Sequence, residues 1–420
     1  MKTEKGASDV AIVGAGLAGL TCARRLHEAG VHATLFEASD AVGGRVRTDT
    51  VEGFLLDRGF QVLLTAYPET RRWLDYDALE LSAFTPGALV QCEGATHRVS
   101  DPLREPGGIW ATLRAPVGSW MDKMRIGTLR AKAGRGTLEE LFARRETTTL
   151  EALRAHGFGE RMIERFLRPW LGGIFLEREL ETSSRMLEFV FRMFAQGGTA
   201  VPARGMQAIP EQLAAALPMG VVRLKTRVTS LEASEAGVSV RLESGERVQA
   251  RRAIVATEGD AAARFFPEVP SPAWRSTVTV YFAAQRSPIG EGTLWLNGTG
   301  RGRVNNLVVM SDVAPRYAPP GQSLVSVSLI GDAAELTDQA LGASVEEELA
   351  ESFGTEVLGW RLLRVYRIPR ALPVRFPLVR EPAREVRPGV WVCGDHRSTA
   401  SIQGAMESGR AAAEAVLARG

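Results

Sequence analysis

Residues 10–44 read VAIVGAGLAGLTCARRLHEAGVHATLFEASDAVGG. A β-branched run at residues 10–13 is followed at once by three glycines, Gly14, Gly16 and Gly19. Apolar side chains then recur every three or four positions, which is the period of an amphipathic helix. The stretch therefore predicts a strand, a tight glycine-rich turn and a helix.

The three glycines have different physical roles in such a unit. Gly14 permits the tight turn, Gly16 lets the backbone approach a pyrophosphate, and Gly19 lets the helix pack closely on the strand. The helix N-terminus offers free N–H groups to the phosphates. A second strand, predicted at residues 33–36, ends in Glu37, whose carboxylate can accept both hydroxyls of an adenosine ribose. This context favours a dinucleotide-binding unit over a packing turn.

The residues after Glu37 help to decide which dinucleotide the unit binds. An acid at the end of the second strand suits either NAD or FAD. Gly43, Gly44 and Arg45 then place a second glycine pair and a cation just beyond it. A second backbone approach to the diphosphate, with Arg45 to neutralise its charge, suits a larger dinucleotide that lies across the sheet. The pattern favours FAD as the cofactor.

At this point the sequence resembles the superfamily of flavin-containing amine oxidases, phytoene desaturases and protoporphyrinogen oxidases. In that superfamily a glycine pair, Arg and Thr follow the acid, as GGRVRT does at residues 43–48. An Asp-x-Gly motif lies beside the flavin ring, and residues 57–61 read DRGFQ. A strand that ends in Gly-Asp and an Ala-rich helix, at residues 389–417, match its final motif. The resemblance implies an α/β fold: a Rossmann-type, glutathione-reductase-like FAD-binding domain with a three-stranded meander, and a substrate domain of mixed sheet and helices.

The same resemblance implies a set of cofactor-binding residues. Asp395 would bind a hydroxyl on the ribitol or phosphate side, the backbones of Ile402 and Gln403 would face the pyrimidine, and the backbone of Val228 would contact the adenine. The alternative for Val228 is a plain hairpin without a ligand. The positive end of the helix after Asp395 would stabilise anionic reduced flavin. The complete set is Gly14, Ala15, Gly16, Leu17, Ala18, Gly19, Glu37, Ala38, Gly43, Gly44, Arg45, Arg58, Gly59, Phe60, Val228, Gly394, Asp395, Ile402, Gln403 and Ala405.

The chain is expected to alternate between two domains. The FAD-binding domain is assigned to residues 1–85, 199–270 and 374–420, and the substrate-binding domain to residues 86–198 and 271–373. The first substrate block is predicted to contain a hairpin at residues 88–99 and helices at 158–168 and 184–194, separated by a break at 169–173. The second is predicted to contain strands at residues 276–284, 292–296, 304–310 and 323–330 and a helix at 344–352.

Composition excludes several other classes of protein. With 420 residues, 45% of them hydrophobic, the chain can form two domains with their own cores, and a net charge of +2 gives no reason to expect nucleic acid. Cys22, Cys92 and Cys393 form no CxxC, which argues against disulfides and zinc, and the histidines show no metal-ligand spacing, so no metal is expected. The start, MKTEKGASDV, reads as a polar lead-in, not a signal peptide. We therefore expect a cytoplasmic protein whose membrane contact, if any, is peripheral.

The substrate is the least determined part of the function. No acid or base can be assigned, and Phe60 and Gln61 are the expected substrate-facing residues because they follow Gly59. The aromatic pair and strand lysine typical of amine oxidases are not evident, which favours a large apolar substrate of the polyene or porphyrinogen kind. Without a second GxGxxG unit, the electron acceptor is expected to be dioxygen or a quinone. A flavin amine oxidase and a non-catalytic binding protein of the GDP-dissociation-inhibitor type stay open as alternatives.

Residues 110–132 carry a basic amphipathic pattern. The apolar positions at helical spacing are Trp110, Leu113, Val117, Trp120, Met121 and Met124, and the cations are Arg114, Lys123, Arg125, Arg130 and Lys132, against Asp122 alone. Pro116 must begin or break a helix here. Such a helix can lie in the headgroup region of a membrane. It can equally pack its apolar side on the substrate domain, and the sequence leaves both possibilities open.

Overall fold

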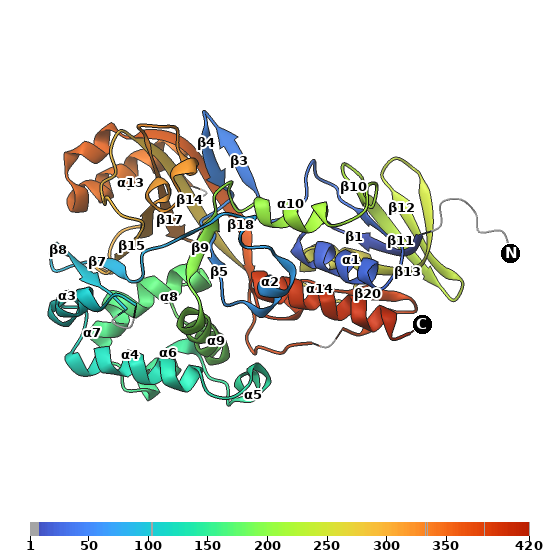
Figure 1. Ribbon diagram of the computed structural model, residues 1–420, viewed down its shortest axis with the longest axis horizontal. Helices are drawn as coiled ribbons and strands as arrows, with labels where there is room; N and C mark the ends of the chain where they lie inside the picture. The colour runs from blue at the N-terminus through green and yellow to red at the C-terminus, as the bar shows by residue number, and fades with distance from the viewer. Residues whose placement is uncertain (1–7, 102–103, 332, 334, 382, 420) are drawn as a thin grey trace.

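An eight-stranded sheet carries the glycine-rich turn in the computed structural model, which describes residues 8–101, 104–331, 333, 335–381 and 383–419 (Figure 1). Residues 1–7 of the predicted lead-in lie outside the described residues. The strand order is β10 (Val222–Arg223), β2 (Ala33–Phe36), β1 (Ser8–Val13), β13 (Arg247–Val255), β12 (Gly237–Leu242) and β11 (Val228–Ser234); β20 (Val390–Val392) also pairs with β13, and β19 (Glu385–Arg387) pairs with β20. The parallel strands and the antiparallel meander β11–β12–β13 confirm the predicted fold class.

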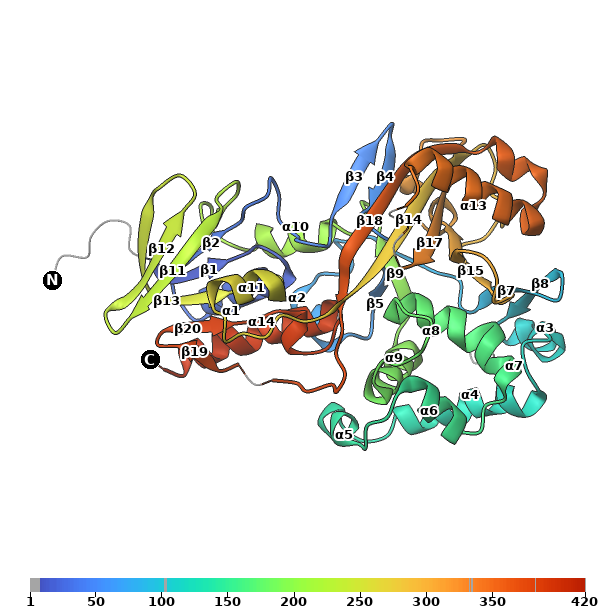
Figure 2. The ribbon, with the colours of Figure 1, turned by 180° about the vertical axis from the view of Figure 1, so that it is seen from behind.

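Strand β1 is apolar from Val10 to Val13 because both faces of the sheet are covered there. Val10 and Ile12 belong to the core under α1 (Leu17–Glu28) and α14 (Ile402–Leu417). Ala11 and Val13 belong to the core shared with the meander and α11 (Gly259–Phe265) on the opposite face, which Figure 2 brings to the front. A parallel strand buried on both faces is expected to be continuously hydrophobic.

Strand β13 connects the meander to the parallel sheet. Its first residues pair with β12 in antiparallel fashion, whereas its last residues lie between β1 and β20 in parallel fashion, with Ile254 opposite Ile12 and Trp391. The carboxyl ends of β1, β13 and β20 therefore meet at one edge of the sheet. Ligands of open α/β sheets bind at this edge.

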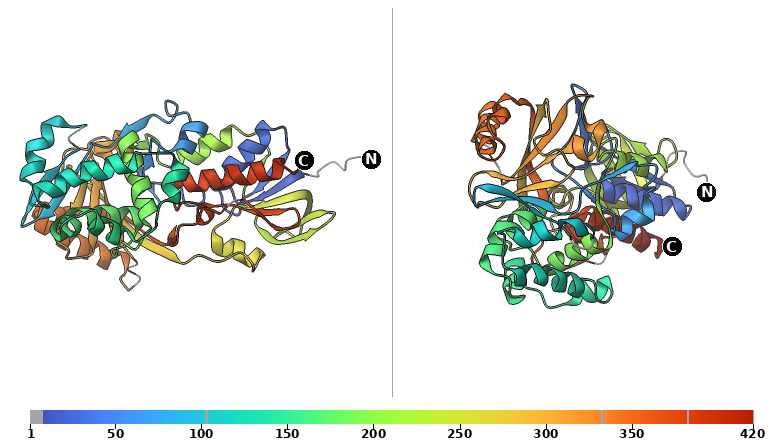
Figure 3. Two further views of the ribbon diagram at one scale, coloured as in Figure 1. Left: turned by 90° about the horizontal axis from the view of Figure 1, so that it is seen from below. Right: turned by 60° about the vertical axis from the view of Figure 1, so that its left-hand side comes forward.

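A second sheet of seven strands forms the other end of the molecule. Its order is β18 (Arg361–Pro373), β14 (Trp274–Ala284), β17 (Ser323–Ile330), β16 (Val304–Val309), β15 (Leu294–Asn297), β7 (Ala88–Cys92) and β8 (Ala95–Val99). Helix α13 (Asp338–Phe353) covers one face and a block of helices lies on the other (Figure 3, right). Helix α13 begins six residues before the predicted start because the Thr337 side chain caps it, accepting a hydrogen bond from the Ala340 N–H.

The sequence prediction is least accurate in the helical block. It consists of α3 (Ile109–Arg114), α4 (Trp120–Ala133), α5 (Leu138–Ala143), α6 (Thr149–Ala155), α7 (Glu160–Met162), α8 (Arg168–Phe175) and α9 (Ser184–Gln196). The predicted break at residues 169–173 is wrong, because α8 runs through it. Pro169 lies in the first turn of α8, directly after a π-helical turn at Ile163–Leu167. The wider π-helical turn before it leaves room for the proline ring, so the helix continues through this position.

Several smaller elements complete the fold. They are the hairpin β3 (Thr48–Val51) and β4 (Phe54–Asp57), the sheet of β5 (Leu63–Leu64), β9 (Thr199–Pro202) and β6 (Leu81–Ala83), and helices α2 (Pro68–Trp73), α10 (Ala208–Ala215) and α12 (Met310–Val313). The strands of the first main sheet all fall in the segments assigned to the FAD-binding domain, and those of the second in the segments assigned to the substrate-binding domain. The boundaries themselves stay a proposal.

The carboxyl group of Asp57 joins several of these elements in the interior. It accepts hydrogen bonds from the Thr48 hydroxyl (2.5 Å), the Met206 N–H (2.9 Å) and the Tyr317 hydroxyl (2.9 Å), while the Tyr281 hydroxyl donates to its backbone carbonyl (2.9 Å). Burial raises the pKa of Asp57 from 3.8 to about 6, although the three hydrogen bonds to the carboxyl group lower it. The folded chain thus binds this proton more tightly than the unfolded chain. The stability that Asp57 contributes is complete below about pH 4 and is lost as the pH rises through about 6.

We predict that Tyr317→Phe destabilises the protein more at pH 8 than at pH 5. At pH 8 the variant leaves a buried carboxylate with one donor fewer, which costs about 1–3 kcal/mol of unfolding free energy. At pH 5 the carboxyl group of Asp57 is protonated and the loss should be smaller. The matched control is Tyr366→Phe, whose hydroxyl donates to Asp49 (2.7 Å), a group whose pKa is lowered, chiefly by the hydrogen bond from Arg58. Urea denaturation at both pH values measures the losses, and an equal loss for Tyr317→Phe at both would contradict the assignment.

Candidate active site

A cavity of about 1610 Å³ extends from the glycine-rich turn to helices α3 and α4. It passes the carboxyl edge of the first sheet, the segment Gly59–Gln61 and the space between the second sheet and helices α8 and α9. Pockets for a single small ligand usually measure about 300–1,000 Å³. The cavity therefore has room for a dinucleotide and a second molecule beside it.

The glycine-rich turn has the geometry of a phosphate cradle. Gly14 has a φ of +103°, and a Cβ there would lie 2.9 Å from the Ala256 carbonyl oxygen. A Cβ on Gly19 would overlap with the Gly14 carbonyl group, whereas a Cβ on Gly16 would meet no atom within 4 Å. The space above Gly16 is open, and no side chain caps the first turn of α1. Its N–H groups are thus available to an anion.

The second glycine pair, Gly43 and Gly44, packs against this turn. The Gly43 N–H donates to the Ala15 carbonyl (2.8 Å), and a Cβ on Gly44 would lie 3.4 Å from the Gly16 Cα. Next to it, Arg45 Nη2 donates to Asp395 Oδ1 (2.7 Å), across 350 residues of sequence. The cation and the carboxylate assigned to the cofactor from opposite ends of the chain therefore meet in one wall of the cavity.

Glu37 is held at the end of β2 by the backbone of the turn. Its Oε2 accepts from the Ala15 N–H and its Oε1 from the Ser39 N–H, both at 2.8 Å. A carboxylate oxygen can accept more than one hydrogen bond, so both oxygens can also accept from ribose hydroxyls. The cradle, the uncapped helix and this carboxylate together fit the adenosine diphosphate half of FAD.

Most of the predicted cofactor residues line the cavity. Those that do are Gly14, Gly16, Leu17, Ala18, Glu37, Gly43, Gly44, Arg45, Arg58, Gly59, Phe60, Gly394, Asp395, Ile402 and Ala405, as does Gln61. Ala15, Gly19, Ala38, Val228 and Gln403 do not. Gln403 Oε1 instead accepts a hydrogen bond from the Glu69 N–H (2.9 Å), and Val228 lies in β11 of the meander. Direct contact of all these residues with FAD stays a prediction.

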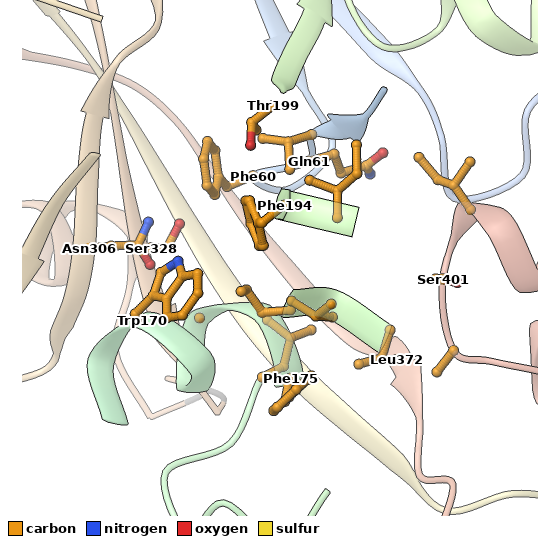
Figure 4. Close-up of a pocket in the computed structure, with 18 of the residues that line it drawn as sticks. Phe60, Gln61, Trp170, Phe175, Phe194, Thr199, Asn306, Ser328, Leu372 and Ser401 are labelled. Atoms are coloured by element: carbon orange, nitrogen blue, oxygen red, sulfur yellow. The ribbon is translucent and has the colours of Figure 1, made fainter. Parts of the chain in front are cut away.

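The two predicted substrate-facing residues have different surroundings (Figure 4). The Phe60 ring contacts the Phe84 ring edge-to-face, with centroids 6.2 Å apart, and the Phe60 N–H donates to the Thr279 hydroxyl (3.2 Å). Gln61 Nε2 donates to the carbonyls of Arg45 (2.9 Å) and Arg58 (3.0 Å). Phe60 therefore presents a ring to the cavity, whereas the amide of Gln61 holds the loop beside it.

Aromatic residues of α8 and α9 line the part of the cavity beyond Phe60. The Trp170 ring lies 5.3 Å from the rings of Phe191 and Phe194 and stacks on Phe166 at 5.7 Å. Figure 4 shows Trp170, Phe175 and Phe194 around one space, with Leu372 nearby. The sequence prediction missed this wall, because it treated residues 169–173 as a break. The available signal was the apolar period that continues through Trp170.

The charged groups that line the cavity are engaged by protein partners. The one lysine among the described lining residues is Lys123, near α3, and its Nζ donates to the carbonyls of Leu113 and Ala115 (both 2.8 Å). Asp101 pairs with Arg130 (2.7 Å), and Glu258 lies 3.9 Å from Arg45. Four described carboxylates line the cavity, Glu37, Asp101, Glu258 and Asp395, and each contacts a donor or a cation of the protein itself.

The family follows from a comparison with known proteins. A family model described as "Flavin containing amine oxidoreductase" matches residues 17–417. The chain belongs to this family. This flavin oxidoreductase is thus an FAD-dependent enzyme, as the cradle and Glu37 indicate, and the alternative of a non-catalytic binding protein is set aside.

Relatives of this flavin oxidoreductase act on different substrates. It is similar to a 15-cis-phytoene desaturase of an Oncidium hybrid cultivar, with 24% identity over 97% of this chain and 78% of the relative. It also resembles protoporphyrinogen oxidase 2 of Arabidopsis thaliana, with 28% identity over 39% of this chain and 32% of the relative.

Solved structures agree on the fold. An oxidoreductase from Methanosarcina mazei has a TM-score of 0.74 at 18% identity, covering 97% of this chain and 99% of that chain. Cyclohexylamine oxidase from Brevibacterium oxydans IH-35A has a TM-score of 0.72 at 17% identity, covering 98% and 99%. Similarity at these identities establishes the fold and leaves the substrate open.

We predict that Glu37→Ala weakens FAD binding by a factor of 10 or more. The carboxylate would make two charge-assisted hydrogen bonds to the ribose, each worth about 1.5–3 kcal/mol before competing terms. Titration of the apoprotein with FAD, followed by flavin fluorescence, measures the change. Glu28→Ala, at the exposed end of α1, is the matched control and should bind FAD normally. A Glu37→Ala protein that purifies with full flavin content would show that the assignment is wrong.

Proposed function

We propose that this enzyme abstracts hydride from a large, apolar substrate of the polyene or porphyrinogen kind. FAD, when bound, accepts the hydride, and dioxygen or a quinone then removes the electrons. The observation that carries the proposal is the cavity of about 1610 Å³, whose part beyond Phe60 is lined by aromatic and aliphatic side chains. A wall of this kind binds hydrocarbon by excluding water from it.

The chain's own residues contribute position more than acid–base chemistry. Aromatic side chains at Phe60, Trp170 and Phe194 would hold the substrate flat beside the flavin segment, while Gln61 fixes the loop that carries Phe60. Holding two reactants in a productive geometry accounts for a large part of many enzymatic rate enhancements. The described carboxylates that line the cavity all contact protein donors or cations, which supports an apolar substrate over an amine.

We predict that phytoene or protoporphyrinogen, and not putrescine, bleaches the flavin absorbance of the purified holoenzyme under anaerobic conditions. Trp170→Ala should slow this bleaching about 10-fold at low substrate, because it removes a large apolar contact. Trp360→Ala is the matched control, since Trp360 packs against the core on the other face of the second sheet. Rapid bleaching by simple amines, with no response to the two apolar substrates, would overturn the proposal.

We further propose that the substrate enters from a membrane surface at α3 and α4. Six of the eleven exposed large hydrophobic residues in the described part of the chain lie on these two helices: Ile109, Trp110, Leu113, Trp120, Met121 and Met124. Four of them, Ile109, Leu113, Trp120 and Met124, also line the cavity. No helix among the described residues is long and apolar enough to span a bilayer, so the proposed contact is a surface contact.

The structure changes the sequence-based interpretation of this surface in two respects. Val117 is fully buried in the turn between α3 and α4, so it is not part of the exposed face. Three of the predicted lipid-facing cations are paired within the protein, since Arg125, Arg130 and Lys132 contact Asp122, Asp101 and Glu188, respectively. Arg114, at the end of α3, makes no such pair with a described carboxylate. The tryptophans should therefore contribute more to lipid binding than the net charge.

We predict that the holoenzyme co-sediments with vesicles that contain phosphatidylglycerol, and that salt weakens the binding only in part. Replacing both Trp110 and Trp120, which are 68% and 64% exposed, by Ser should reduce binding at least 10-fold. The matched control replaces Met219 and Leu358, which are exposed on other elements, by Ser. A wild-type protein that stays in the supernatant at low salt, or two double variants that lose binding equally, would reject the membrane proposal.

A further inference from the structure

A row of polar side chains crosses the cavity face of the second sheet. Thr279 of β14 lies opposite Ser328 of β17, and Ser328 lies opposite Asn306 of β16. Neighbouring strands are about 4.8 Å apart, so the row extends roughly 10 Å from Thr279 to Asn306. Asn306 and Ser328 both line the cavity, next to the ring of Trp170 (Figure 4). The row places polar groups beside the aromatic side chains of α8.

Two members of this row have unused hydrogen-bonding capacity. Thr279 accepts from the Phe60 N–H, but Asn306 Nδ2 and Ser328 Oγ form no hydrogen bond with any described residue. Both side chains are buried, with Asn306 2% and Ser328 7% exposed. Buried polar groups without partners destabilise a protein and are rare in native structures. Here two of them lie side by side at the same cavity.

Asn305 fixes the orientation of the Asn306 amide. Asn305 Nδ2 donates to the Pro169 carbonyl and to Asn306 Oδ1, both at 2.9 Å. Because Asn306 must present its oxygen to this donor, its Nδ2 group is the side left without a partner. The contact to Pro169 also anchors the pair to the start of α8. The unpaired donor is therefore held in place by the surrounding structure.

The chemistry of the pair selects one kind of ligand group. Asn306 Nδ2 can only donate, whereas the Ser328 hydroxyl can donate or accept. A carbonyl oxygen could accept from both, and a hydroxyl group could accept from Asn306 and donate to Ser328. A carboxylate would also need a cation. Arg275, which lines the cavity from the same strand as Thr279, is already paired with Glu177 at 2.7 Å.

We infer that Asn306 and Ser328 bind a neutral oxygen, a carbonyl or a hydroxyl group, on a substrate that is otherwise hydrocarbon. The inference rests on the proposed function, because it specifies the substrate class of the same cavity. It predicts that, on one polyene skeleton, an oxygenated molecule binds more tightly than the plain hydrocarbon. Asn306 and Ser328 act as specificity residues and take no part in hydride transfer.

Retinal, retinol and the hydrocarbon of the same polyene skeleton test this assignment. Binding to the holoenzyme is followed by quenching of tryptophan fluorescence, for which Trp170 is well placed. The aldehyde and the alcohol should each bind about 10-fold more tightly than the hydrocarbon, since each satisfies a buried donor that the hydrocarbon leaves unpaired. Retinoic acid, as a carboxylate, should bind more weakly than retinal.

Variants of the pair should remove this preference without loss of flavin. Ser328→Ala and Asn306→Leu should bind all three neutral probes alike, with unchanged or improved affinity for the hydrocarbon. Ser328→Ala should keep or raise the melting temperature, because its hydroxyl group has no described partner. The matched control is Thr277→Val, since Thr277 lines the cavity but its hydroxyl already donates to the Leu329 carbonyl (2.8 Å).

The results of these experiments separate a failure of the inference from a failure of the proposed function. Equal affinity of the wild type for aldehyde, alcohol and hydrocarbon would overturn the inference while leaving an apolar substrate in place. Failure of every retinoid probe to bind would overturn the inference, whereas the proposed function is decided separately by the bleaching of the flavin with phytoene or protoporphyrinogen. A Ser328→Ala protein that melts earlier and keeps the preference would show that the hydroxyl serves the fold through water, which also overturns the inference.

Discussion

The arrangement of the cofactor wall depends on backbone contacts that leave no room for a side chain. A Cβ on Gly19 would overlap with the Gly14 carbonyl, and a Cβ on Gly409 would overlap with the Ala18 carbonyl. The first contact sets the distance between α1 and β1, and the second sets the distance between α14 and α1. Because both helices are fixed at backbone contact, the uncapped end of α1 and the start of α14 face the same space. Interiors are packed too densely for larger residues to be accommodated here without backbone shifts.

The parts of the site that a short segment specifies could be predicted from the sequence. Gly14, Gly16 and Glu37 belong to one strand-turn-helix-strand unit, so their spacing determines their geometry, and Gly394 and Asp395 are recognisable by the strand before them and the helix after them. Chain connectivity alone brings such residues together. The parallel pairing of β1, β13 and β20 then brings motif residues from both ends of the chain to one cavity.

No comparable sequence motif predicts the residues that line the substrate part of the cavity. Trp170, Asn306 and Ser328 come from a helix and two strands that meet only in the tertiary structure, and each looks like an ordinary core residue in its own segment. Pro169 was misleading because the π-helical turn before it cannot be recognised from local composition. Two cations of α4 were misleading for a related reason, since Arg130 and Lys132 pair with Asp101 and Glu188, which lie outside α4. Pairing across elements is what a single sequence conceals.

The contact between Arg45 and Asp395 has a consequence for the order in which the enzyme is made. A ribosome releases the N-terminal cradle first, and more than three hundred further residues must follow before the carboxylate that completes the same wall is synthesised. Strand β20 and helix α14, which carry and flank that carboxylate, follow every strand of the second sheet in chain order. The nascent chain therefore holds half of a cofactor site for most of its synthesis. The wall that Arg45 and Asp395 share is complete only once both segments have been made.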